Sequence, residues 1–180
     1  MAEIMPIIAE LEKRFAVTHI PLGGVPSAPP GQPAGQPAPP AQPAPQAFSV
    51  TEPIVKVDPK KILAVCSFLA ASGFDYLLTV TAADFPQRIE VLYFLCSMSG
   101  RLRLELKCEL PRDKPEIDSV SGVWKAALYP EREVYDLFGI KFKGHPDLRR
   151  IFLEDEFEGY PLRKDYTSDF LVKMPEVGFR

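Results

Sequence analysis

Histidine and cysteine are scarce in this sequence, which excludes most local metal sites. The 180 residues include two histidines and three cysteines. The cysteines lie inside apolar segments, form no C-x-x-C pair and have no histidine nearby: Cys66, Cys96 and Cys108. Zinc and iron–sulfur sites need several such ligands at short spacing. We therefore expect reduced, buried thiols, and neither a metal centre nor a disulfide framework.

Long apolar runs and nucleotide-binding loops are also missing. The longest apolar stretch, Ile62–Ala71, is far shorter than the roughly 20 residues of a membrane-spanning helix. Neither G-x-x-x-x-G-K-[ST] nor G-x-G-x-x-G occurs. The N-terminus has no basic region followed by an apolar run, as a secretory signal would have. We expect a cytoplasmic chain that does not span a membrane and binds no nucleotide.

A basic excess is missing as well, because the formal net charge is -3. A protein that wraps a phosphate backbone normally carries a positive face, so nucleic acid is an unfavourable partner. The length and the 46% hydrophobic content suffice for one globular core.

Two segments precede the expected domain. Residues 1–20 are predicted to form an amphipathic helix, because four apolar side chains recur at helical spacing: Ile7, Ile8, Leu11 and Phe15. Residues 21–47 are rich in Pro, Ala and Gln, which is typical of a flexible linker. Two alternatives stay open for the helix. It docks on a partner, or it folds back on its own domain.

Residues 48–145 are predicted to form an α+β domain. We expect an edge strand over 48–57, three further strands over 74–81, 88–98 and 101–110, and a hairpin turn at Ser99–Gly100, with glycine at positive φ. The last strand alternates between leucines or Cys108 and charged residues, so one sheet face is expected to be core and the other solvent or partner.

Helices are expected on one face of this sheet. Asp58 and Pro59 are typical of a helix start, and Gly73 of its end. Ser119 or Ser121 is expected to cap a helical segment containing Trp124 and Leu128, and a second helix is expected from Pro130 to Gly139. The predicted fold class is therefore α+β, with an antiparallel or mixed sheet packed against helices on one face.

The sequence changes character after Ile140. Up to Tyr166 it shows no strand or helix period, although apolar and charged side chains alternate irregularly among Gly and Pro. Long structureless segments in compact domains are uncommon unless they are functional. We predict that residues 146–180 form an extended C-terminal docking segment on another protein, since Arg and aromatic residues are enriched at interface hot spots. The alternative is a charged loop that closes over its own core.

Residues 131–166 resemble the signature of the family of the thirty-kilodalton (C) subunit of NADH-quinone oxidoreductase, respiratory complex I. The resemblance rests on the runs EREVYDLFGIKFKGHPDLRRI (131–151) and GYPLRKDY (159–166). Two positions depart from the family pattern, Tyr160 in place of a common histidine and Thr167 in place of a common proline. The resemblance implies that these residues form a partner interface: Glu131, Arg132, Glu133, Asp136, Phe138, Gly139, Gly144, His145, Pro146, Asp147, Arg149, Arg150, Gly159, Pro161, Leu162, Arg163, Lys164, Asp165 and Tyr166.

The resemblance further implies a structural subunit of the peripheral arm, at the cytoplasmic face of the inner membrane. Its implied neighbours are the forty-nine-kilodalton (D) subunit and the subunit with the terminal iron–sulfur cluster (B). FMN and iron–sulfur clusters would lie in other subunits of a complex that uses NADH and quinone and translocates protons. The alternative is the equivalent subunit of a membrane-bound nickel–iron hydrogenase, formate hydrogenlyase or F420H2 dehydrogenase.

A catalytic role is a third hypothesis, from a different class. Glu131, Glu133 and Asp136 are acids close in sequence, and His145 is a candidate proton shuttle, a role that histidine often has. Helix-start electrostatics and a pairing of Arg132 with Asp136, four residues on, explain the acids without chemistry. A histidine between Gly144 and Pro146 is more often bonded to backbone or a partner. We therefore expect no catalytic, cofactor-binding or metal-binding residue in this chain.

Overall fold

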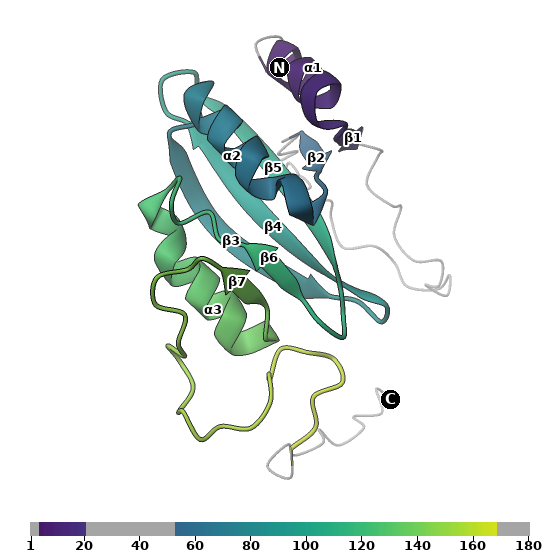
Figure 1. The fold of residues 1–180 in the computed structure, drawn as a ribbon, viewed down its shortest axis with the longest axis vertical. Coiled ribbons are helices and arrows are strands. Elements are labelled where there is room, and N and C mark those ends of the chain that lie inside the picture. The colour runs from purple at the N-terminus through teal and green to yellow at the C-terminus, as the bar shows by residue number, and fades with distance from the viewer. Residues whose placement is uncertain (1–3, 21–52, 169–180) are drawn as a thin grey trace, which may run out of the picture.

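The structure, a computed structural model, describes residues 4–20 and 53–168. The predicted linker, the start of the predicted strand 48–57 and the end of the predicted docking segment lie outside these ranges. The described part contains a five-stranded sheet, a two-stranded sheet and three α-helices (Figure 1). Because helices α2 and α3 lie on one side of the large sheet, the predicted α+β class with a mixed sheet is confirmed.

Three long antiparallel strands form the centre of the large sheet. β3 (Tyr76–Asp84) pairs with β4 (Arg88–Ser97), which pairs with β5 (Leu102–Pro111). Beyond β5, β2 (Ile54–Lys56) runs parallel to it, and β1 (Thr18–Ile20) is antiparallel to β2. The prediction that β2 is an edge strand is wrong, because β1 from the N-terminal region pairs with its free side.

Side chains alternate along β5 as predicted. Leu104 and Leu106 are buried in the core, and the charged residues between them point to the opposite face. On that face the Glu90 carboxylate lies 2.7 Å from both the Arg88 guanidinium and the Lys107 ammonium. Burial opposes ionisation of Glu90, but the hydrogen bonds from Lys107 and Arg88 outweigh it and lower its pKa. This charged face is thus paired internally at its centre.

The turn between β4 and β5 differs from the prediction in one residue. Arg101 takes the positive φ, 51°, and Gly100 does not. The N–H of Gly100 donates to the Ser97 hydroxyl at 3.2 Å, which closes the turn. The hairpin is confirmed, but the residue expected to supply the left-handed backbone is wrong.

Helix α2 (Ile62–Ala71) covers the sheet after a short 3-10 turn over Pro59–Lys61. The predicted cap is confirmed, since the Asp58 carboxylate accepts a hydrogen bond from the N–H of Lys60 at 2.9 Å. Gly73, with φ 96°, follows the helix end as expected.

Helix α1 (Met5–Phe15) folds back on its own domain, which decides between the two alternatives. Its side chains Ile8 and Leu11 are buried in the common core. The Phe15 ring meets the Phe68 ring of α2 edge-on at 5.8 Å, and the Lys61 ammonium donates to the Phe15 carbonyl at 2.9 Å. The prediction that the helix extends to residue 20 is wrong, because α1 ends at Phe15 and Thr18–Ile20 form β1.

One continuous helical region follows the large sheet. It consists of a 3-10 turn, Lys125–Ala127, and helix α3 (Leu128–Phe138). The prediction of a separate helix starting at Pro130 is wrong, because Pro130 lies in the first turn of α3, where a missing N–H is tolerated. Gly139, with φ 74°, ends α3 as expected, and its N–H donates to the Tyr135 carbonyl at 2.8 Å.

The last described part of the chain is irregular. β7 (Lys141–Lys143) pairs in parallel with β6 (Glu116–Asp118), and residues 144–168 contain neither helix nor strand. Figure 1 shows this part of the chain looping out beside α3. Side chains rather than secondary structure must therefore hold it. No helix within the described ranges is long and apolar enough to cross a membrane.

Candidate docking site

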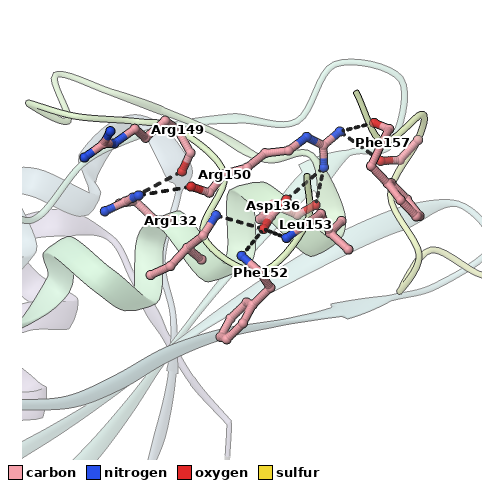
Figure 2. A network of polar contacts seen from close by, with 9 residues as sticks. Arg132, Asp136, Arg149, Arg150, Phe152, Leu153 and Phe157 are labelled. Carbon is pink, nitrogen blue, oxygen red and sulfur yellow. Dashed lines mark hydrogen bonds and ion pairs between the residues drawn. The ribbon is translucent and has the colours of Figure 1, made fainter. Parts of the chain in front are cut away.

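Asp136 is the polar centre of the region between α3 and the irregular segment. Its side chain is fully buried. Its Oδ2 atom accepts hydrogen bonds from three consecutive backbone N–H groups, Ile151 at 3.0 Å, Phe152 at 2.8 Å and Leu153 at 3.0 Å (Figure 2). Successive N–H groups that converge in this way form a concave anion site. Here the anion belongs to the same chain, so one carboxylate fixes the path of a segment that lacks secondary structure.

Arg150 holds the other side of the same loop. One guanidinium nitrogen lies 2.8 Å from Asp136 Oδ1, and the other donates to the carbonyls of Phe157 at 2.9 Å and Gly159 at 3.3 Å. Burial opposes ionisation of Asp136, but the three backbone N–H groups and Arg150 outweigh it and lower its pKa. The Arg150 guanidinium thus connects Asp136 of α3 to residues 157–159 of the irregular segment.

Arg132 does not pair with Asp136, contrary to the prediction. Its guanidinium donates to the carbonyls of Arg149 at 3.1 Å and Arg150 at 3.0 Å, and it lies 3.9 Å from the Asp147 carboxylate (Figure 2). The reason is that the folded loop brings Arg150 to the carboxylate that Arg132 was expected to bind. The spacing of residues in the sequence predicts which side chains are neighbours on the same helix. It cannot predict that a loop residue, here Arg150, binds the carboxylate instead.

Glu131 is buried inside the domain rather than exposed at a helix start. It accepts hydrogen bonds from the Ser119 hydroxyl at 2.5 Å and the Val120 N–H at 2.8 Å, and Ser119 also lies 2.7 Å from the Ser121 hydroxyl. Burial raises the pKa of Glu131 to about 7, although these hydrogen bonds oppose the shift. Ser119 therefore holds Glu131, and Ser121 bonds Ser119. The prediction that one of these serines caps a helix is wrong. Glu133 is exposed, so the two acids share no cleft.

His145 uses both ring nitrogens on backbone groups. Its Nδ1 accepts from the N–H of Asp147 at 3.1 Å, and its Nε2 lies 3.0 Å from the Leu128 carbonyl. The first bond uses the lone pair of Nδ1, which leaves Nε2 to donate to the Leu128 carbonyl. The flanking Gly144 has φ 81°, and Pro146 is exposed. This arrangement leaves neither nitrogen facing a reactant.

Two glycines let aromatic rings pack directly on the backbone. A Cβ at Gly139 would overlap the ring of Tyr160, and a Cβ at Gly159 would lie 2.8 Å from the ring of Tyr166. Both glycines also have positive φ, 74° and 91°. The Tyr166 ring stacks on the Phe157 ring, with the two ring centroids 5.9 Å apart. Positive φ and close approach therefore both require glycine at these two positions.

Arg163 ties the segment to the end of α3. Its Nε donates to the Phe138 carbonyl at 2.6 Å, and the preceding N–H, of Leu162, donates to the Leu137 carbonyl at 3.2 Å. The guanidinium also lies over the Tyr160 ring at 5.0 Å. These bonds satisfy carbonyl groups that a helix end leaves unpaired.

Asp84 and Arg112 form a second attachment, which was not predicted from the sequence. Asp84 Oδ2 lies 2.8 Å from the Arg112 guanidinium and accepts the N–H of Lys164 at 2.7 Å. Arg112 also lies 2.8 Å from the Asp165 carboxylate and donates to the Phe85 carbonyl at 3.1 Å. No motif marks these positions, because Asp84 is 28 residues from Arg112 and 80 from Lys164. Only tertiary structure brings them together.

A different set of residues in this region is left exposed. Within the described ranges the Arg149 side chain pairs with Asp147 alone, at 3.0 Å, and Pro161 is half-buried. The apolar side chains Ile151, Phe152 and Leu162 are exposed. Among the described residues, no group of three or more His, Cys, Asp or Glu could hold a metal ion. Three exposed apolar side chains and one exposed arginine thus lie on this part of the surface.

Residues 55–170 match the family described as "Respiratory-chain NADH dehydrogenase, 30 Kd subunit". The chain belongs to this family. The matched range contains both attachments described above, the one at Asp136 and the one at Asp84. The resemblance seen in the signature is thereby confirmed.

Two members of the thirty-kilodalton family show how widely its sequence is shared. The C subunit of NADH-quinone oxidoreductase from Moorella thermoacetica is 43% identical over 120 residues, which are 65% of this chain and 81% of that protein. The C subunit of F(420)H(2) dehydrogenase from Methanosarcina mazei is 46% identical over 116 residues, which are 62% of this chain and 73% of that protein. Relatives in two kinds of complex are therefore about equally similar.

Two solved structures have folds similar to that of this chain. A trypsin-resistant fragment of Nqo5 superimposes with a TM-score of 0.60 at 24% identity, covering 80% of this chain and 98% of the fragment. A chain of the membrane-bound sulfane sulfur reductase, an archaeal respiratory complex, superimposes with a TM-score of 0.68 at 22% identity. The match covers 93% of this chain and 86% of that chain. At these identities the likeness concerns the fold alone.

Proposed function

We propose that this chain is a structural subunit of the peripheral arm of NADH-quinone oxidoreductase. It contacts the forty-nine-kilodalton (D) subunit and the subunit that carries the terminal iron–sulfur cluster (B), at the cytoplasmic face of the membrane. FMN and the iron–sulfur clusters lie in other subunits, and this chain supplies no catalytic residue. Its contribution is the rigidity and assembly of the module that passes electrons from NADH to quinone.

The observation that carries this proposal is what the charged signature residues bind. Asp136, Arg150 and Arg132 all contact main-chain groups of the segment that follows α3. A general acid or base must reach a reactant with a free position. These three groups direct their polar atoms to their own chain, which supports a role in shaping a surface.

Affinity purification tests the proposal. The chain would be tagged in its own cells, extracted in mild detergent, and the co-purifying subunits identified and counted by mass spectrometry. We expect iron–sulfur and membrane subunits in equal stoichiometry, together with NADH-quinone activity. Recovery of the chain alone would overturn the proposal.

The non-catalytic part of the proposal needs a separate experiment. His145→Gln removes the imidazole, and the new amide can still donate to the Leu128 carbonyl that His145 contacts. We expect unchanged NADH-quinone turnover per assembled complex. A variant complex that assembles fully but turns over tenfold more slowly would instead give His145 a part in the reaction.

A second candidate is the equivalent subunit of a related machine, such as F420H2 dehydrogenase, a membrane-bound nickel–iron hydrogenase or formate hydrogenlyase. The 46% identity to the Methanosarcina mazei protein favours keeping this candidate. The same purification separates the two, because the complexes differ in their electron-input subunits. Nickel–iron or F420-oxidising subunits in place of NADH-oxidising ones would select the second candidate.

A further inference from the structure

Residues 150–159, here called the clamped loop, are held at one end by Asp136 of α3 and at the other by Arg150, a loop residue that is itself paired with Asp136. The first part of the loop is fixed by the Asp136 carboxylate, and the last part by the contacts of Arg150 with the Phe157 and Gly159 carbonyls. The loop is therefore ordered although it contains no secondary structure. Binding residues are often carried on loops that a rigid scaffold positions in this way.

The clamped loop presents a large apolar side chain to solvent. Phe152 is 64% exposed and Ile151 beside it is also exposed, although the backbone N–H groups of both residues are bonded to the buried Asp136. Figure 2 shows the Phe152 ring turned away from this polar network. A folding requirement would bury such a ring, because an exposed phenylalanine forgoes about 2 kcal/mol of burial.

Four carboxylates follow this apolar residue within the next six positions of the same loop: Glu154, Asp155, Glu156 and Glu158. All four are exposed, and none makes a side-chain hydrogen bond or ion pair within the described ranges. Like charges at such short spacing repel one another in the free chain. Cations across an interface would remove this repulsion.

We propose that the clamped loop binds a partner subunit that presents an apolar pocket for Phe152, bordered by lysine and arginine side chains. The inference rests on the proposed function. It adds the identity of the docking surface and the sign of the charge on the partner. Because Asp136 and Arg150 order the loop before binding, association costs little loop entropy, which favours a tight contact from a small area.

Charge decides against two other occupants of the clamped loop. The cytoplasmic surface of a membrane is anionic and repels four carboxylates. A second copy of this chain would bring the same acidic loop against the first, and like-charge contacts weaken an interface. A basic protein surface is the occupant that complements both the acids and the exposed ring.

Two variants test this surface in the intact complex. Phe152→Ala removes the apolar contact, and the double change Glu154→Gln/Glu156→Gln removes two charges. The complex would be captured through a tag on this chain, and the rate at which other subunits dissociate during washing would be measured by mass spectrometry. We expect at least tenfold faster dissociation for Phe152→Ala, and a weaker salt dependence of dissociation for the double variant, which keeps Asp155 and Glu158.

Matched controls come from exposed residues elsewhere in the domain. Met98 is 66% exposed at the turn after β4, so Met98→Ala removes a similar exposed apolar side chain. Glu10→Gln/Asp113→Asn removes two exposed charges outside the loop. All four proteins should melt within a few degrees of the wild type, because each altered side chain is exposed. We expect wild-type dissociation rates for both controls.

The outcomes separate this inference from the proposed function. If the wild-type chain captures no other subunits, the proposed function fails. If it captures them and Phe152→Ala behaves like Met98→Ala, the docking surface is wrong while the function stands. Binding of the wild-type chain to anionic phospholipid vesicles that Phe152→Ala abolishes would overturn the inference in favour of a membrane contact.

Discussion

The Asp136 carboxylate and the Arg150 guanidinium lie 2.8 Å apart, and this contact joins α3 to the loop that follows it. Asp136 is fully buried and Arg150 is partly buried. A buried ion pair offsets its desolvation cost only when further hydrogen bonds satisfy both groups. Here Asp136 also accepts three backbone N–H groups and Arg150 donates to two more carbonyls, so the pair is fully supported.

Removing the charge of Asp136 should therefore loosen the loop and weaken the fold. We expect Asp136→Asn to lower the free energy of unfolding by about 3 kcal/mol, because it leaves Arg150 partly buried without its anion. Urea denaturation of the chain measures this change, and limited proteolysis should cut residues 151–158 faster. Asp147→Asn, which breaks an exposed ion pair with Arg149 and a longer contact of 3.9 Å with Arg132, should cost less than about 1 kcal/mol. Equal effects of the two variants would contradict this account.

The packing of Tyr160 on Gly139 gives a second prediction. Gly139→Ala places a Cβ against the Tyr160 ring and also requires alanine at φ 74°. The backbone alone should cost about 1 kcal/mol, and displacement of the ring should add to it. A double-mutant cycle with Tyr160→Ala separates the two, since only the steric part is relieved. Full additivity of the two substitutions would show that the ring does not pack on this glycine.

The sequence predicts the long elements of this fold because local signals are strong there. Two local signals are confirmed, the strict alternation along β5 and the Asp58–Pro59 start of the helical region, where they begin the 3-10 turn that leads into α2. The short strands could not be predicted in the same way. β1 and β2 have three residues each, and their place in the sheet depends on pairing across a sequence gap rather than on periodicity.

Only part of the candidate site could be predicted from the sequence, because most of its contacts join residues that are distant in the chain. The signature drew attention to Asp136, Arg150 and Arg163, whose types and clustering are visible in the sequence. Their partners are mostly backbone groups of a folded loop, which no side-chain pattern encodes. The sequence did not predict Asp84 and Arg112 as part of the site, because they belong to no motif. Whether the signature faces a partner stays a prediction.

Tyr93 provides a prediction about the core. Its ring is fully buried on β4, and its hydroxyl has no hydrogen-bond partner among the described residues. Burial raises the pKa of this hydroxyl well above its ordinary value, so it remains protonated. An unsatisfied buried hydroxyl costs roughly 1–3 kcal/mol. We expect Tyr93→Phe to leave the fold intact and to raise the free energy of unfolding by about 1 kcal/mol in urea denaturation. A loss of stability would instead reveal a partner for the hydroxyl.

Glu131 should make stability fall as pH rises towards neutrality. Its pKa is raised by burial from an ordinary 4.5 to about 7 in the folded chain. Below about pH 4.5 it is protonated in both states and carries no penalty. As pH rises towards 7 the unfolded chain loses the proton first, so the folded state loses up to about 3 kcal/mol, a penalty that stays constant at higher pH.

Glu131→Gln isolates this effect, because glutamine does not titrate. Four carboxyls have lowered pKa values, Glu90, Glu116, Asp136 and Asp165, and each makes the fold less stable as pH falls below its ordinary range, but equally in both proteins. The difference in unfolding free energy between variant and wild type therefore reports Glu131 alone. We expect it to shift in favour of the variant by roughly 2–3 kcal/mol between about pH 4.5 and about pH 7.5, measured by urea denaturation. Parallel stability curves would mean that Glu131 titrates in the same pH range in the folded and the unfolded chain, with the hydrogen bonds from Ser119 and Val120 fully compensating its burial.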